Sequence, residues 1–196
     1  MSGLTTTDRL QELLPQLFSS KKLEGKYYLR FQLSKDISGL IDLKYVRESL
    51  TIAGDRLTAV PNLPEYVVGL MSSRNQVFLA MDLAHLAGLK PETVNLRQYQ
   101  TIVVQLDVGS PEQPSEEIAL FGLTVPEING IARILPQEFE TSLPSNIPKS
   151  LALFIRGSIL QQNQDEDAPN TNSNSARYSY LIDIPELIVT NTKSQS

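Results

Sequence analysis

Few residues in this sequence could perform chemistry, because it contains one histidine, His85, and no cysteine. A Ser-His-Asp site would have to use His85, which stands in the short amphipathic segment LAHLAGL. A catalytic zinc ion usually takes three protein ligands, and no second histidine is present. Neither G-x-x-x-x-G-K-[ST] nor G-x-G-x-x-G occurs, so no phosphate cradle is visible. We therefore expect no metal and no cofactor, and we expect His85 to be a surface residue of a short helix.

Two weaker chemical patterns remain. Residues 19–22 spell S-x-x-K, but this match is only four residues long and lies in a polar linker. Glu48 and Asp82 could be read as an acid/base pair. However, Asp82 ends an apolar, strand-like segment, and no substrate-orienting motif accompanies either carboxylate. We do not expect an enzyme, although a deep polar pocket that held both carboxylates would favour one.

Composition narrows the class of protein. The 196 residues are 41% hydrophobic and 20% charged, which is typical of a folded globular chain that buries a core. The net charge of −5 argues against a nucleic-acid surface, because phosphate binding requires clustered Lys and Arg. No apolar run approaches the roughly 20 residues that span a bilayer. We expect a cytoplasmic protein without direct membrane insertion.

The N-terminal part, residues 1–26, is expected to be a helical extension followed by a linker. Its apolar residues recur at helical spacing; they are Leu10, Leu13, Leu14, Leu17 and Phe18. Pro15 interrupts the pattern and predicts a kink or two short helices, since an interior proline costs about 3 kcal/mol. The stripe could pack on the body of the same molecule or dock on a partner, and the pattern alone leaves both possibilities open.

Strand patterns dominate the domain expected over residues 27–190. If VRESLTI is extended, Val46 and Glu48 share one side with apolar residues, and an acid on such a face needs a partner. QVFLAMDL is apolar on both faces, as in a buried strand, and LAHLAGL reads as a short helix. Asn129-Gly130 is a hairpin signal, although the strand could simply bend there.

The remaining segments complete a mainly β fold of nine or ten short strands, most simply one or two small barrels. Two halves of similar length would be divided near residues 90–100. Residues 161–177 contain no aliphatic side chain larger than alanine and are expected to be a mobile insertion. Residues 191–196 are expected to be a frayed tail.

From Tyr28 to Val189 the chain resembles the CheW-like domains, the coupling proteins of bacterial chemotaxis arrays. The most specific segment is PNLPEYVVGLMSSRNQVFLAMDL, in which the residues that match the family are Gly69, Arg74, Asp82 and Leu83. The turn departs from the family's Asn-Leu-Arg-Gly at Ser72-Ser73 and at Asn75. Asn75 can still adopt the left-handed conformation, so the turn is expected to form.

Three further segments follow in order. SGLIDLKYVRESLTI places Val46 and Glu48 on the family's Val and Glu. IALFGLTVPEI is similar to a strand that commonly carries Val-Asp-x-Val, but Leu123 replaces the aspartate. FIRGSI and YLIDIPELI resemble the final glycine-containing strand and the closing Leu-Asp-x-x-x-Leu. The front extension is most similar to the cyanobacterial PilI/PixI adaptors of type IV pilus motility and phototaxis.

The resemblance implies a CheW-like fold of two SH3-like, five-stranded β-barrels packed around a shared apolar seam. It implies a non-enzymatic adaptor that couples a methyl-accepting receptor to a CheA-type histidine kinase. Partner-binding residues would be Val46, Glu48, Arg74 and Val125. Val46 and Val125 could instead be ordinary core residues. We predict that Glu48 and Arg74 pair, and the pair could bind a partner or only pin two strands.

A different regulatory role is also compatible with this resemblance. The chain could be a CheW-like module that binds a response regulator, or that titrates the kinase, without coupling a receptor. The N-terminal stripe could serve that contact, or it could merely strengthen the fold.

Overall fold

The computed structural model describes residues 24–91, 96–107, 118–144, 147–160 and 178–193. The expected helical extension, its apolar stripe and the polar insertion lie outside these ranges. The described strands form two five-stranded sheets. The first sheet contains, in spatial order, β8 (Glu127–Ile134), β1 (Lys26–Ser34), β2 (Ile37–Asp42), β10 (Tyr178–Ile182) and β9 (Ile155–Leu160). The second contains β3 (Val46–Ala53), β6 (Gln98–Asp107), β7 (Ile118–Val125), β5 (Gln76–Asp82) and β4 (Val67–Ser73).

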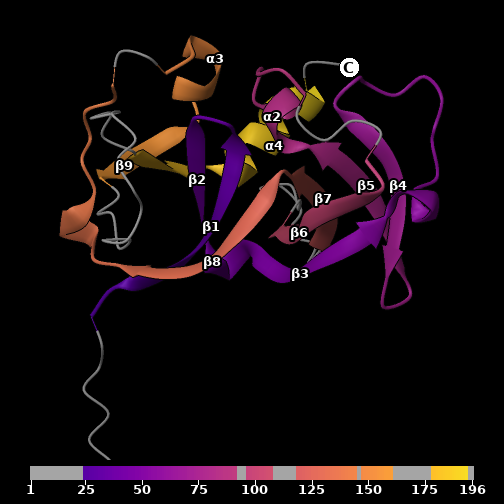
Figure 1. Cartoon of the computed structure of the whole chain (residues 1–196), viewed down its shortest axis with the longest axis horizontal. Helices are drawn as coiled ribbons and strands as arrows, with labels where there is room; N and C mark the ends of the chain where they lie inside the picture. The colour runs from indigo at the N-terminus through magenta and orange to yellow at the C-terminus, as the bar shows by residue number, and fades with distance from the viewer. Residues whose placement is uncertain (1–23, 92–95, 108–117, 145–146, 161–177, 194–196) are drawn as a thin grey trace, which may run out of the picture.

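Each sheet is closed into a small barrel by a bridge between its two edges. In the second sheet, Thr58 follows edge strand β3 and exchanges backbone hydrogen bonds of 2.9 and 2.8 Å with Leu70 of β4. In the first sheet, Glu140 follows edge strand β8 and exchanges bonds of 2.8 and 2.9 Å with Ser158 of β9. We call the first sheet barrel A and the second barrel B; they lie side by side (Figure 1). The expected mainly β, twin-barrel fold class is confirmed.

Each barrel takes strands from both halves of the sequence. The β1–β2 hairpin belongs to barrel A together with β8, β9 and β10, whereas the β6–β7 hairpin belongs to barrel B together with β3, β4 and β5. Both hairpins are joined to their barrel by a parallel pair, β2 with β10 and β7 with β5. A division of the sequence near residues 90–100 therefore does not separate the barrels, because the two halves exchange hairpins.

Short helices connect and cover the strands. Helix α2 (Leu83–Leu86) follows β5, and α4 (Ile184–Lys193) follows β10 at the equivalent place in the other barrel. The shorter elements are α3 (Lys149–Ala152), η1 (Leu43–Tyr45), η2 (Gly54–Arg56) and η3 (Pro136–Glu138). Because α4 continues to Lys193, the first residues of the expected tail are helical.

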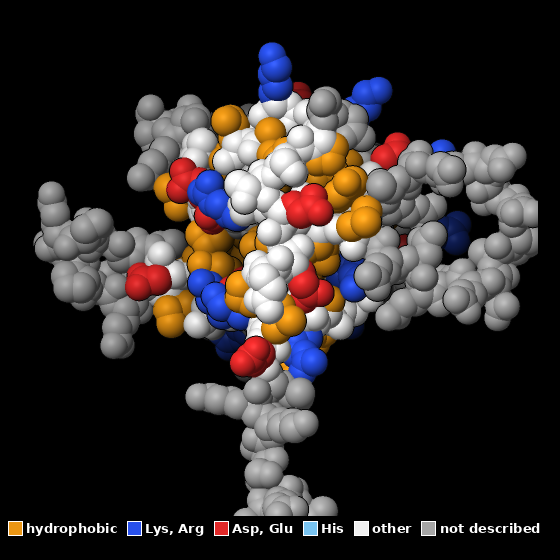
Figure 2. All heavy atoms as spheres, turned by 90° about the vertical axis from the view of Figure 1, so that its left-hand side faces the viewer, with side chains coloured by type: hydrophobic (Ala, Val, Ile, Leu, Met, Phe, Trp, Pro, Cys, Tyr) orange, Lys and Arg blue, Asp and Glu red, His pale blue; other side chains and the backbone are white. Residues whose placement is uncertain are grey.

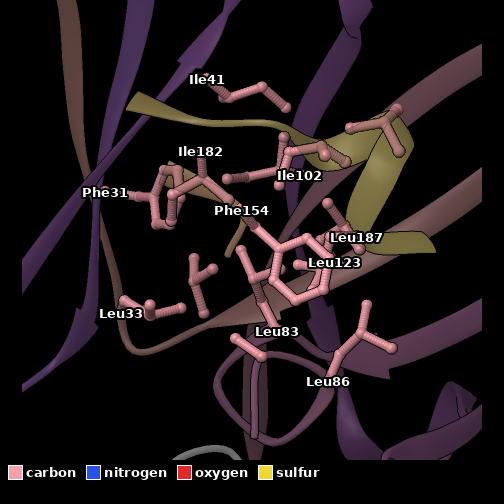
Figure 3. Close-up of a cluster of buried hydrophobic side chains, with 14 of the residues drawn as sticks. Phe31, Leu33, Ile41, Leu83, Leu86, Ile102, Leu123, Phe154, Ile182 and Leu187 are labelled. Carbon is pink, nitrogen blue, oxygen red and sulfur yellow. The ribbon is translucent and has the colours of Figure 1, made fainter. Parts of the chain in front are cut away.

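The largest cluster of buried side chains lies between the barrels. Phe31, Leu33 and Ile41 enter it from barrel A, and Ile102 and Leu123 enter from barrel B (Figure 3). Leu83 and Leu86 of α2 and Leu187 of α4 complete this seam. The barrel interiors hold smaller clusters, with Tyr28, Leu40 and Ile134 in barrel A and Ile52, Met71, Phe78, Ala80 and Val103 in barrel B. Burying one such side chain contributes about 1.5–3 kcal/mol, so the seam makes the pair of barrels one body.

Among the irregularities of the strands, the bulges in β8 and β3 bear on expectations from the sequence. In β8, Gly130 pairs with Arg30 and Ile128 pairs with Phe31, so Asn129 is an extra residue. Of the two possibilities for Asn129-Gly130, the hairpin is wrong and the bend within the strand is confirmed, because Gly130 uses its positive φ of 93° in a bulge within β8. In β3, Val46 pairs with Val104 and Glu48 pairs with Val103, so Arg47 is the extra residue.

Candidate functional site

The β4–β5 hairpin turns through only two residues, Arg74 and Asn75, between the paired residues Ser73 and Gln76. Their φ angles are 47° and 64°, as a two-residue turn of type I′ requires. The left-handed conformation predicted for Asn75 is confirmed. Arg74 adopts it as well, although residues with a Cβ atom are disfavoured there. The hairpin therefore presents a long cationic side chain from a tight and fixed turn.

The bulge in β3 decides which way Glu48 points. Val46 stands opposite Val104 of the seam, whereas Glu48 stands opposite Val103, which belongs to the interior of barrel B. The expectation that Val46 and Glu48 share one face is therefore wrong, because the extra residue Arg47 reverses the alternation. Glu48 lies on the interior face, near the start of the strand.

Glu48 finds its partners on the β4–β5 hairpin. Arg74 Nε lies 3.1 Å from Glu48 Oε2, and the Ser73 hydroxyl donates a hydrogen bond of 2.9 Å to Glu48 Oε1. The predicted pairing of Glu48 with Arg74 is confirmed, with Nε as the contacting atom. The two side chains differ in environment, since 74% of Arg74 but only 16% of Glu48 is exposed. A shielded carboxylate thus holds an exposed guanidinium.

Val46 and Val125 occupy different surroundings. Val46 is partly buried and packs against the seam at the start of β3, so part of its side chain remains on the surface. Val125 is 1% exposed and belongs to the seam itself. The core-packing alternative fits Val125, which has almost no surface to offer to a partner in this structure.

Asp82 and His85 lie at the other end of the same hairpin. Asp82 caps α2, because its Oδ1 accepts a hydrogen bond of 2.9 Å from the backbone N–H of His85. Glu48 contacts Ser73, near the start of β5, and Asp82 ends that strand, so about 20 Å of strand separates the two carboxylates. They do not form an acid/base pair. His85 is half-buried in α2, and the described residues contain no cluster suited to a metal ion.

Two exposed apolar residues of barrel B were not among the residues that the sequence predicted to bind a partner. Val77 of β5 is 68% exposed and Ile118 of β7 is 54% exposed. The parallel register, Leu79 with Phe121, places both residues at the hairpin end of barrel B. The only signal was that QVFLAMDL is apolar on both faces, so one face had to meet something other than the barrel interior.

Barrel A also exposes apolar side chains. Figure 2 shows hydrophobic groups between Lys, Arg, Asp and Glu on the side of the molecule that barrel A forms. The large exposed hydrophobic residues of the barrel A strands are Tyr27, Ile131 and Leu160. Leu153, in the segment between α3 and β9, is also exposed. Within the described residues, no helix is both long and apolar enough to cross a bilayer.

Comparisons with known proteins agree with this architecture. The family model described as "CheW-like domain" matches residues 28–188. The chain is similar in structure to the scaffolding protein TtCheW from Thermoanaerobacter tengcongensis, with a TM-score of 0.58 and 18% sequence identity. That match covers 83% of this chain and 92% of the TtCheW chain. A search of curated protein sequences found no match.

Proposed function

Because its residues 28–188 match the family model, the chain belongs to the CheW-like domain family, and we propose that it is a non-enzymatic adaptor. In this proposal it couples a methyl-accepting receptor to a CheA-type histidine kinase. The pathway is chemotaxis, phototaxis or type IV pilus motility, as the resemblance to PilI/PixI adaptors suggests. The adaptor works in the cytoplasm, where receptor arrays recruit it.

The stiffness of the body supports this role. The buried seam joins the two barrels, and one edge bridge closes each sheet, which removes most free strand edges. A rigid body that is held by a receptor on one surface and by a kinase on another can transmit a change of receptor state. Neither contact requires a reactive group.

The observation that carries the proposal is the exposed guanidinium of Arg74, fixed by Glu48 in a strained turn. A long cation is not needed to close a turn of type I′, where Asn, Asp and Gly are preferred. Arg is also enriched at protein interfaces. On the opposite face of β3, at the start of the strand, Val46 is only partly buried and packs against the seam between the barrels. An interface of about 800 Å² per partner would suffice, with a few such anchors supplying most of the energy.

Affinity capture of the chain from its native host tests the adaptor role. A receptor and a CheA-type kinase should be captured together, and both should bind the purified chain directly. Capture of a response regulator with no receptor would support the alternative regulatory module instead. Direct binding to neither a receptor nor a kinase would refute the adaptor.

A further inference from the structure

The bulge in β8 contains the only Asn-Gly pair of the sequence, Asn129-Gly130. The register between β1 and β8 steps from Gly130 to Ile128, so Asn129 has no partner residue on β1. β8 stands at the edge of its sheet, and among the described strands it pairs only with β1. A bulge leaves its extra residue unpaired and disrupts the ladder locally. Asn129 therefore lies where the strand is least constrained.

The surroundings of the pair leave its side-chain amide free to move. Asn129 and Gly130 are both exposed. The Asn129 amide makes no hydrogen bond with another residue that the structure describes. A Cβ atom on Gly130 would meet nothing within 4 Å, so open space lies beside the backbone at this point. Neither a bond nor a neighbouring group keeps the amide away from the next peptide unit.

These two residues can react with each other. The backbone nitrogen of Gly130 attacks Cγ of Asn129, because the two atoms close a five-membered ring and glycine has no side chain to obstruct the approach. A bond forms between that nitrogen and Cγ, and the bond from Cγ to Nδ2 breaks. Nδ2 leaves as ammonia, which carries away the proton of the Gly130 amide. The product of this step is a cyclic imide.

Water then opens the imide at one of its two carbonyl carbons. Cleavage of the new bond to Cγ restores the original chain and leaves aspartate at position 129. Cleavage of the original peptide bond leaves isoaspartate, in which the chain runs through Cβ and Cγ. Over both steps one water is consumed and one ammonia is released, with no oxidation or reduction.

We propose that Asn129-Gly130 is a site of spontaneous deamidation in the folded protein, which adds one negative charge to the bulge of β8. The proposal does not depend on the adaptor function. Isoaspartate adds one carbon atom to the chain at the point where β8 already has one residue more than β1. Arg30 pairs with Gly130, is half-buried and has no acid within ion-pair distance among the described residues. The folded barrel therefore accommodates both products, because the bulge absorbs the added atom and this cation attracts a nearby carboxylate.

Peptide mapping by mass spectrometry tests the proposal on the purified full chain. The folded protein is incubated in mildly alkaline buffer made with water that carries heavy oxygen, which enters the product when the imide opens. Asn62 and Asn75 are the matched comparison, because both are exposed and each precedes a residue with a side chain. Asn129 should convert at least about tenfold faster than either of them. An isoaspartate methyltransferase should label part of the product.

Two variants examine the route. Gly130→Ala should slow the conversion at least about tenfold, because a Cβ atom obstructs the attacking nitrogen. Asn129→Gln should show no conversion at position 129, because its longer side chain would have to close a larger ring. The deamidated chain, separated by ion exchange, should melt within about 4 °C of the unmodified chain.

A synthetic peptide of residues 125–135 supplies the unfolded reference. If the peptide converts while Asn129 of the folded chain stays intact, the bulge protects the amide and the proposal is overturned. Conversion of Asn62 or Asn75 at the rate of Asn129 would overturn the selectivity, and a wild-type rate in Gly130→Ala would overturn the route. A deamidated chain that melts far below the unmodified one would show that the barrel does not accommodate the products.

Discussion

Arg74 Nε lies 3.1 Å from Glu48 Oε2, and this contact joins the two edge strands of barrel B. β3 and β4 stand at opposite ends of the sheet order, so the ion pair spans the place where the barrel closes. The Thr58–Leu70 bridge closes the same gap through the backbone. The pair therefore links the two edges of barrel B, and its proposed role in partner binding needs variants that separate it from this closure.

Arg74→Gly should separate them. An ion pair whose cation is 74% exposed contributes roughly 0–1 kcal/mol, and Ser73 still bonds the Glu48 carboxylate when Arg74 is removed. Glycine relieves the left-handed conformation at φ 47° by about 1–2 kcal/mol. We expect the free energy of unfolding to stay within about 1 kcal/mol of wild type. Kinase activation in a reconstituted receptor–kinase array should nevertheless be lost. Asn75→Gly is the matched control, because it relieves the same turn and removes no charge. A melting temperature that falls in proportion to activity would show that the pair only pins the strands.

The seam between the barrels should dominate stability. Leu123 is fully buried there, and Leu123→Ala should cost about 2–5 kcal/mol in the free energy of unfolding. Ile118→Ala on the same strand should change it by less than about 0.5 kcal/mol, since Ile118 is 54% exposed. Urea denaturation measures the free energy of unfolding of both variants. Equal costs at the two positions would mean that the seam is not the main core.

The strands were predictable from the sequence, whereas their distribution between barrels was not. Alternating apolar residues mark β1 and β6 as strands, but alternation does not state which sheet a hairpin joins. That choice is made by long-range parallel pairs such as Leu40 with Leu181. The Asn129-Gly130 pair could not distinguish a hairpin turn from a bulge, because a residue with positive φ suits both.

Two glycines with positive φ should respond differently to alanine. A Cβ atom on Gly69 would lie 2.7 Å from the Thr58 carbonyl oxygen, which belongs to the bridge that closes barrel B. A Cβ atom on Gly130 would meet nothing within 4 Å. Gly130→Ala should cost only the conformational strain, about 1–2 kcal/mol. Gly69→Ala should cost more and should raise the hydrogen-exchange rate of the Leu70 amide. Equal exchange rates at Leu70 in both variants would contradict the closure role of Gly69.

The site was predictable in part. The Glu48–Arg74 pair followed from an acid on an apolar face and a long cation at a tight turn. Ser73 was noted only as a departure from the family pattern, because a serine at the end of a strand gives no sign of its partner. Only the expectation that Val46 shares a face with Glu48 failed, because the extra residue Arg47 in the bulge reverses the alternation between them.

Alkaline pH should destabilise the fold through buried tyrosines. Burial, and then the charge of Asp42, raises the pKa of Tyr28 above its ordinary value of 10.0, and burial also raises the pKa of Tyr66 and Tyr180. A raised pKa in the folded state means that the unfolded chain releases these protons first. Stability is therefore full below pH 10 and falls as pH rises through the folded-state values.

Thermal denaturation between pH 8 and pH 11.5 measures this effect. Tyr28→Phe should flatten the alkaline fall, because phenylalanine keeps the edge-to-face contact with Phe139 and has no proton to lose. A Tyr28→Phe curve parallel to wild type would assign the fall to other groups.

Deleting residues 1–23 should leave both barrels folded. The seam and both barrel interiors are built from described residues that begin at Tyr28. If the stripe of Leu10, Leu13, Leu14, Leu17 and Phe18 packed on the body, its loss would remove several buried side chains, each worth about 1.5–3 kcal/mol. Such a loss would lower the melting temperature by more than about 10 °C in a chain of this size.

We expect deletion of residues 1–23 to change the melting temperature by only a few degrees. The double variant Leu13→Glu, Leu17→Glu in the full chain should show the same small change. A larger fall in the melting temperature of both the truncated chain and the double variant would mean that the stripe packs on the barrels. A stable truncated chain that no longer binds one partner would make the stripe a docking segment for that partner.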